Sequence, residues 1–142
     1  MGYRSEVVLA IAPEAAHAFM TLTAQCPEVM QLCQDADQFE SGYQDKGDWF
    51  IRWSHIKWYD SYPEVAALEA FINALESDDL SDYGEKESPE APHNRVDASG
   101  DSMPRTEWAE FFKFVRVGEE MDDNEVRGYG FENIWIQRAI DY

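Results

Sequence analysis

A run of twelve residues, 48–59 (DWFIRWSHIKWY), constrains the fold of this chain more than any other part of the sequence. Seven of the twelve are aromatic or aliphatic, and the aromatic and β-branched enrichment favours a strand over a helix. Successive side chains of a strand point to opposite faces, so both faces of this strand have apolar groups to bury. We predict a central strand with Trp49, Ile51 and Trp53 on one face and Phe50, Ile56 and Trp58 on the other.

Further strands are predicted on both sides of this run. Asp45-Lys46-Gly47 is typical of a turn, so the central strand is expected to form a hairpin with residues 39–43. β-Branched and aromatic residues predict additional strands at residues 5–12, 108–118, 126–131 and 133–140.

Prolines mark the predicted helix starts, because proline fits the first turn of a helix. Pro13 and Pro63 therefore predict two helices, and Pro27 predicts a kink or a restart within the first. Apolar residues at three-and-four spacing give the helix after Pro63 one apolar stripe, which would pack on the sheet. The expected fold class is α+β, with a mainly antiparallel sheet of about five strands and two helices packed on one face.

Residues 77–107 show neither the strand-forming composition nor the helical spacing of apolar residues. They are acidic, contain three prolines and have few large apolar groups, which predicts a long, mobile loop. The loop is either a solvated insertion or a functional segment. The whole chain, 1–142, is expected to be a single domain.

Net charge separates this chain from ordinary small domains. Its 29 acidic and 11 basic residues give −18, whereas a small soluble domain carries a magnitude of about 2–8. Self-repulsion at this charge costs stability. Either the acids keep an aromatic-rich protein soluble, or they form a surface that docks on a basic partner in the manner of nucleic-acid phosphates. Cation binding is a third alternative.

The same charge bears on partners and location. Direct binding to nucleic acid or to an anionic membrane is electrostatically disfavoured. The sequence has no signal peptide and no segment of the length and apolar character of a membrane span, so a cytoplasmic protein is expected. Cys26 and Cys33 are seven residues apart in a helical pattern, too far for an intrahelical disulfide, and are interpreted as reduced core residues.

No motif indicates catalysis. His17, His55 and His93 lie at no metal-ligand spacing, and the sequence has no nucleophile elbow, phosphate loop or zinc signature. The acidic turn at 119–125 lacks the ligand register of an EF-hand. We therefore expect no enzyme activity, no cofactor and no metal site.

The candidate binding residues are carboxylates, in groups that would lie close together only if the fold brings them together. Tyr83 and Trp108 are candidate exposed anchors beside them. Two main groups are predicted: Asp78, Asp79, Asp82, Glu85 and Glu87 in the long loop, and Glu119, Glu120, Asp122, Asp123 and Glu125 in the acidic turn. A third group surrounds the first hairpin: Asp35, Asp37, Glu40, Asp45 and Asp48.

Two segments carry a resemblance. Residues 2–7 (GYRSEV), with residues 114–120 (FVRVGEE) and the following Asp122 and Asp123, resemble a group of small acidic proteins encoded by bacteriophages and prophages. That group has no established activity to transfer. The resemblance implies a setting in which small acidic proteins inhibit host machinery, as anti-CRISPR and anti-restriction proteins do.

The leading expectation is a phage-type interaction protein that occludes a basic surface on a nucleic-acid-binding host protein in the host cytoplasm. One alternative is an immunity or antitoxin-like protein that neutralises a basic toxin. Another is an acidic housekeeping protein without mimicry, and a small enzyme remains a third. An exposed edge strand near the C-terminal end would also permit a homodimer.

Overall fold

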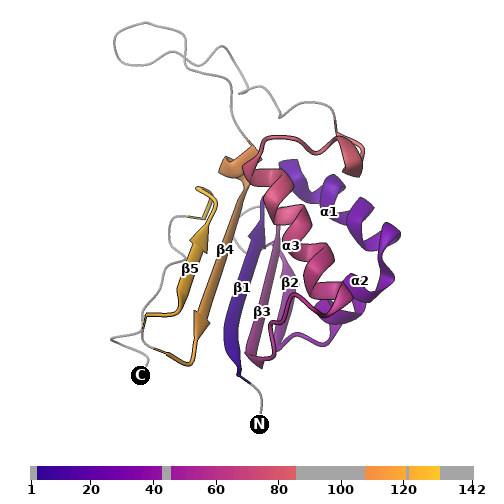
Figure 1. Ribbon diagram of the computed structural model, residues 1–142. Coiled ribbons are helices and arrows are strands. Elements are labelled where there is room, and N and C mark those ends of the chain that lie inside the picture. The colour runs from indigo at the N-terminus through magenta and orange to yellow at the C-terminus, as the bar shows by residue number, and fades with distance from the viewer. Residues whose placement is uncertain (1–2, 43–45, 86–107, 121, 132–142) are drawn as a thin grey trace, which may run out of the picture.

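The computed structural model describes residues 3–42, 46–85, 108–120 and 122–131, and shows a sheet with helices on one face (Figure 1). The strands form one antiparallel sheet in the order β2-β3-β1-β4-β5. Without β5, this is the split βαβ arrangement, with β1 between β3 and β4. The elements are β1 (Ser5–Ile11), α1 (Pro13–Gln25), α2 (Pro27–Gln34), β2 (Gln38–Ser41), β3 (Trp49–Ile56), α3 (Pro63–Glu76), β4 (Phe112–Gly118) and β5 (Asn124–Arg127), with 3₁₀ turns η1 (Ser81–Tyr83) and η2 (Trp108–Phe111).

The α+β class and the five-stranded antiparallel sheet are confirmed, but the described chain has three helices where we predicted two. The predicted restart at Pro27 is a complete break. A residue before proline is disfavoured in the helical region, and Cys26 has φ −134° and ψ 88°. The first predicted helix is therefore two separate helices, each beginning at a proline.

The core lies between the sheet and the helices. Val7, Leu9 and Ile11 alternate along β1 and are fully buried on its helix-facing side. Each fully buried side chain of this kind contributes about 1.5–3 kcal/mol relative to an exposed one. The stripe of α3 packs against this layer as predicted, through Leu68, Phe71, Ile72 and Leu75.

A β-bulge at the end of β3 changes which face its last residues occupy. Ser5 pairs with Ile56 but Val7 pairs with Trp53, so β3 has one more residue than β1 between these pairs. The extra residue reverses the alternation and places Ile56 on the same face as Trp53. His55 in the bulge has φ +57°, a left-handed conformation that costs about 1–2 kcal/mol for a residue with a Cβ.

The prediction for the faces of this strand was therefore wrong in part. Ile56 lies on the helix-facing side, and Trp58 packs there against Trp53 and Phe114, at ring distances of 5.4 and 5.9 Å. The predicted hairpin with β2 is confirmed. β3 lies inside the sheet, although the middle position belongs to β1.

Both aromatic residues expected to be exposed anchors are buried. Trp108 is 1% exposed and Tyr83 is 8% exposed, and Tyr83 packs edge-on against Phe71. Leu80, beside Tyr83, is fully buried. Residues 80–83 therefore pack on the core, while residues 86–107 and the predicted strand at 133–140 lie outside the described residues.

The two buried tryptophans differ in how their indole N–H groups are satisfied, and this predicts different costs of substitution. Trp53 donates to the carbonyl of Leu32 at 2.9 Å, whereas the buried N–H of Trp108 has no acceptor in the described structure. Trp108→Phe removes an unsatisfied donor, while Trp53→Phe leaves a carbonyl without its partner. We expect Trp108→Phe to cost about 1–3 kcal/mol less than Trp53→Phe in urea unfolding. Equal costs would contradict this expectation.

Candidate functional site

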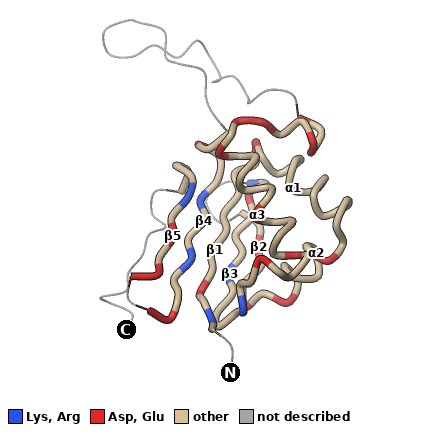
Figure 2. Tube along the Cα trace, viewed as in Figure 1, with Lys and Arg blue, Asp and Glu red and all other residues tan. Residues whose placement is uncertain are grey.

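The structure places the two main carboxylate groups at opposite ends of the sheet. Asp78 accepts a hydrogen bond from the backbone N–H of Trp108 at 2.9 Å, beside the start of β4. The acidic turn follows Gly118, at the far end of the same strand. Seven residues of strand span about 20 Å, so these groups do not form one surface. Figure 2 shows acidic residues at both ends.

Two members of the third group, Asp35 and Asp37, lie at the same end of the sheet as the acidic turn. Glu40 and Asp48 lie toward the other end of β3, and Asp48 is fully buried, so the predicted third group does not form one surface. Arg4 lies where β1 begins, and its backbone N–H donates to Glu119 Oε1 at 2.9 Å. Arg4 also lines a groove with Asp35 and Asp37, which follow α2. The end of the sheet where β1 begins therefore gathers carboxylates from three parts of the chain, and we call them the acidic end: Asp35, Asp37, Asp60, Glu64, Glu119, Glu120 and Asp122.

Two of the predicted carboxylates are held inside this region by an arginine. Arg116 on β4 donates to both oxygens of Asp123, at 2.8 and 3.2 Å, and to Glu125 at 3.4 Å. Asp123 also accepts from the Tyr3 hydroxyl at 2.5 Å. Hydrogen bonding to Asp123 raises the pKa of Arg116 and that of Tyr3 above their usual values. These contacts hold the acidic turn to the start of β1.

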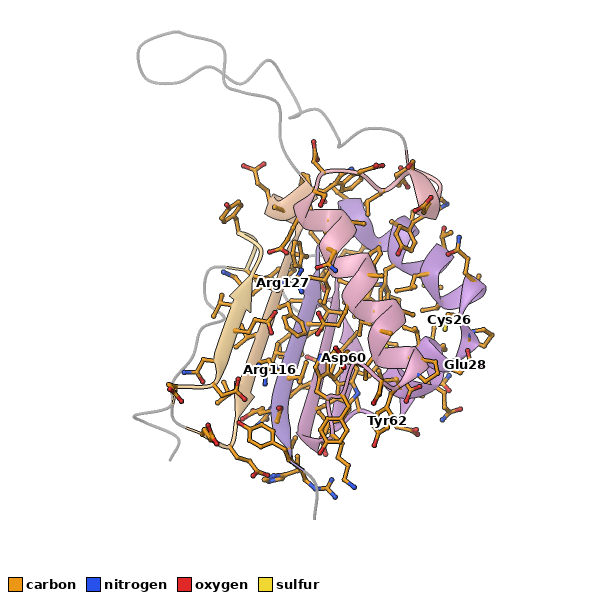
Figure 3. All side chains as sticks on the ribbon, viewed as in Figure 1. Cys26, Glu28, Asp60, Tyr62, Arg116 and Arg127 are labelled. Carbon is orange, nitrogen blue, oxygen red and sulfur yellow. The ribbon has the colours of Figure 1, made fainter. Side chains whose placement is uncertain are left out.

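A second arginine attaches β5 to α3. Arg127 donates to Glu69 at 2.9 Å and to Glu76 at 2.9 Å, and lies 3.6 Å from Glu125. It also bonds Asn73. Burial opposes its charge, but Glu76, Glu69 and Glu125 outweigh this and raise the pKa of Arg127. Figure 3 shows Arg116 and Arg127 at the β4–β5 edge.

In the carboxylate group at the end of α3, several side chains form hydrogen bonds or ion pairs within the protein. Asp79 accepts from the N–H and hydroxyl of Ser81, and hydrogen bonding to Ser81 lowers its pKa. Glu85 pairs with His17 at 2.7 Å. The side chain of Asp82 is exposed without an ion pair in the described chain. Glu87 lies outside the described residues, as do Asp45 and His93.

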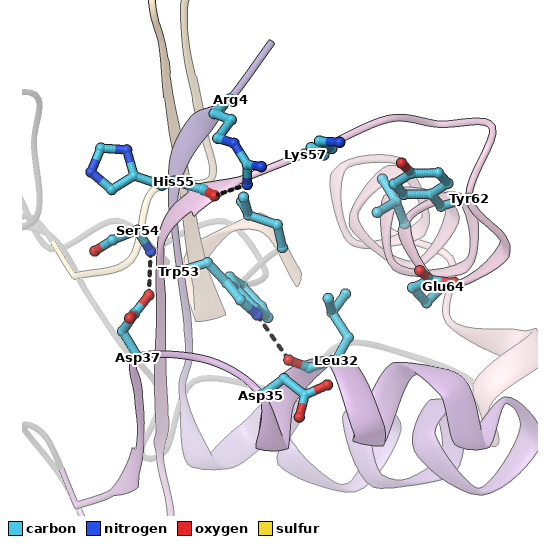
Figure 4. A pocket seen from close by; sticks show the side chains of 12 residues that line it. Arg4, Leu32, Asp35, Asp37, Trp53, Ser54, His55, Lys57, Tyr62 and Glu64 are labelled. Atoms are coloured by element: carbon cyan, nitrogen blue, oxygen red, sulfur yellow. Dashed lines mark hydrogen bonds between the residues drawn. The ribbon is translucent and has the colours of Figure 1, made fainter. Parts of the chain in front are cut away.

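Two grooves flank residues 57–62 at the acidic end. The first, which we call the bulge groove, has a volume of about 540 Å³ and lies between the β3 bulge, the end of α2 and the start of α3 (Figure 4). This size is within the range of about 300–1,000 Å³ typical of ligand sites. Its lining residues are Arg4, Leu32, Asp35, Asp37, Trp53, Ser54, His55, Ile56, Lys57, Tyr62, Glu64 and Val65.

In the second groove, of about 500 Å³, most of the carboxylates already pair with arginines of the same chain. Asp123 and Glu125 on its wall bind Arg116, and Glu69 binds Arg127 and accepts from the Trp58 indole at 2.8 Å. Asp60 alone among its carboxylates has no ion pair in the described structure. Of the two grooves, the bulge groove therefore has more free capacity for a charged ligand.

Charge is divided between the two layers of the fold. Helices α1, α2 and α3 contain no Lys or Arg. The described basic side chains lie on the strands or the segments at strand ends, where Figure 2 shows them in blue. Among the described residues, Arg127 is the only Lys or Arg of the sheet that forms an ion pair with a helix carboxylate, so the helix layer presents acidic charge to solvent.

Groups suited to nucleophilic or metal chemistry are poorly placed in the described part of the chain. Burial raises the pKa of Cys33 to about 12 and also raises that of Cys26, which makes both thiols weak nucleophiles. No group of three His, Cys, Asp or Glu side chains among these residues is arranged to hold a metal ion. Likewise, none of the described helices combines the length and apolar character needed to cross a membrane.

Comparison of the chain with protein-family models, curated proteins and solved structures finds no match. The site must therefore be interpreted from its own geometry. Sequence reasoning missed Asp60, Tyr62 and Glu64, which precede or begin α3, because this segment was interpreted only as a helix start at Pro63. Tyr62 and Glu64 line the same groove as Asp35 because α3 packs against α2, which no local pattern indicates.

Proposed function

We propose that this protein is a non-enzymatic interaction protein whose acidic end docks on a basic surface of another protein. The observation that carries this proposal is the convergence of carboxylates from the α2–β2 connection, the start of α3 and the β4–β5 turn. Six of the seven side chains of the acidic end are exposed, and Glu64 is partly exposed. Such an arrangement gives a complementary potential that accelerates association and makes binding salt-sensitive.

A nucleic-acid-binding surface is the basic surface that fits best. Such surfaces are lined by Lys and Arg that neutralise phosphates, and clustered carboxylates present the same sign of charge. The net charge of −18 disfavours nucleic acid itself as the ligand. The resemblance to acidic phage-encoded proteins supports the same proposal, with a host defence protein as the partner.

The test is capture of the partner followed by competition with nucleic acid. The immobilised protein is incubated with lysate of a bacterial host and washed at low and at high salt, beside an unrelated bait of equal net charge. We expect a basic nucleic-acid-binding protein to be retained by this chain alone, released at high salt, and displaced from its nucleic acid by the soluble protein. Retention of the same proteins by both baits would contradict the proposal, as would no retention.

A further inference from the structure

We propose that the bulge groove receives an arginine side chain of the basic partner, an inference that rests on the proposed function. The floor of the groove is apolar, with aliphatic surface from Leu32, Ile56 and Val65. The Trp53 indole lies beside this floor, held by the Leu32 carbonyl (Figure 4). An extended apolar floor with charged rims suits a side chain that has a long aliphatic stem and a cationic head.

The rims of the groove carry opposite charges. Asp35 stands at the end of α2 and Glu64 at the start of α3, whereas Arg4 and Lys57 lie together across the groove from them (Figure 4). In the described chain Glu64 has no ion pair, and the Asp35 carboxylate accepts from Gln31 at 3.0 Å. The cationic head of the guest would thus lie at Asp35 and Glu64, while the basic rim would face the carbonyl groups of the partner backbone.

Arginine fits this geometry better than lysine. Tyr62 lines the groove and is 37% exposed, so part of its ring is available to a planar cation. A guanidinium group can stack on an aromatic face and bind a carboxylate through two parallel N–H bonds, whereas an ammonium group acts as a point charge.

The strained bulge builds the floor of this groove. Without the extra residue in β3, Ile56 would lie on the other face of the sheet. Arg4 donates to the carbonyl of His55 at 2.9 Å, while the His55 ring points away from Tyr62 and Glu64 (Figure 4). The strained backbone of His55 thus lies in the bulge that directs the Ile56 side chain into the groove.

The experiment uses two peptides, acetylated and amidated hexa-arginine and hexa-lysine, titrated at low salt into the isotopically labelled full-length protein and followed by NMR. We expect the largest shifts at the Trp53 indole N–H and the amides of Lys57 and Glu64. Hexa-arginine should bind about fivefold more tightly than hexa-lysine. Only a guanidinium group can both stack as a plane on the Tyr62 ring and donate two parallel hydrogen bonds to one carboxylate.

Two variants provide a matched comparison. Glu64 and Glu14 each follow the proline at the first position of a helix, and neither has an ion pair in the described structure, so Glu64→Gln and Glu14→Gln remove the same charge from equivalent positions. Glu64→Gln should weaken hexa-arginine binding about fivefold and abolish the preference for arginine, while Glu14→Gln should leave that preference unchanged.

The outcomes separate this inference from the proposed function. Peptide binding with shifts elsewhere on the acidic end, or with equal effects of the two variants, would overturn the arginine groove and leave acidic docking standing. No binding of either peptide at low salt would overturn both. Shifts in the groove, with the arginine preference lost only in Glu64→Gln, would support both.

Discussion

Replacing Arg127 with Met is expected to lower the free energy of unfolding by about 3 kcal/mol, because it leaves neighbouring carboxylates without a cation. Arg127 is 11% exposed and binds Glu69 and Glu76, with Glu125 nearby. Methionine retains much of the aliphatic volume, so the loss reports mainly the charge. The expected cost lies at the low end for a buried pair, since Glu76 is 40% exposed and partly screened by water.

Arg52→Met is the matched control for this measurement. Arg52 pairs with Glu6 at 2.8 Å on the same sheet, but its side chain is 45% exposed. An exposed pair contributes about 0–1 kcal/mol, so this substitution should have a small effect in the same urea unfolding experiment. Equal losses for the two variants would show that Arg127 does not hold β5 to α3 in the way its contacts indicate.

Reversing three charges of the acidic end is expected to weaken binding to the captured partner roughly 100-fold while the protein stays folded. The variant is Asp60→Lys, Glu120→Lys and Asp122→Lys. All three side chains are exposed and none has an ion pair in the described structure, so their replacement breaks no ion pair among the described residues. Affinity is measured by titration calorimetry at fixed salt, and folding by circular dichroism.

A second triple variant separates position from total charge. Glu14→Lys, Asp82→Lys and Glu110→Lys change the net charge equally, and these exposed side chains likewise lack ion pairs among the described residues. They lie away from the acidic end, so their effect should be several-fold smaller. If both triples weaken binding equally, only net charge matters; wild-type affinity in the first triple would refute docking through the acidic end.

Local chemistry made much of the fold predictable. Pro13, Pro27 and Pro63 begin the three helices because each fixes φ and needs no helical N–H partner. Enrichment in β-branched and aromatic residues predicted β1, β3 and β4, although residues 108–111, predicted as the start of a strand, form the 3₁₀ turn η2. The bulge at His55 could not be predicted, because neither flanking residue is glycine and the two-residue alternation of a strand gives no sign of an extra residue.

The site was harder to predict, because its members come from separate parts of the chain. Sequence grouped Asp122, Asp123 and Glu125 together, but only the fold shows that Arg116 binds Asp123 and Glu125 and leaves Asp122 exposed. The burial of Trp108 could not be predicted either. An aromatic residue next to a long polar segment has the same sequence pattern whether it is exposed to bind a partner or packs in the core.

The middle position of β1 has a consequence for how the chain folds during synthesis. β1 is made first but pairs with β3 and β4, and Ser5 and Arg116 are 111 residues apart in the chain. Contacts between such distant residues form slowly and leave apolar strands exposed in unfinished chains. The negative charge of the chain, −18 over its full sequence, should make unfolded copies repel one another during this delay. We therefore expect the carboxylates to reduce aggregation through the apolar residues of β1 while the chain folds.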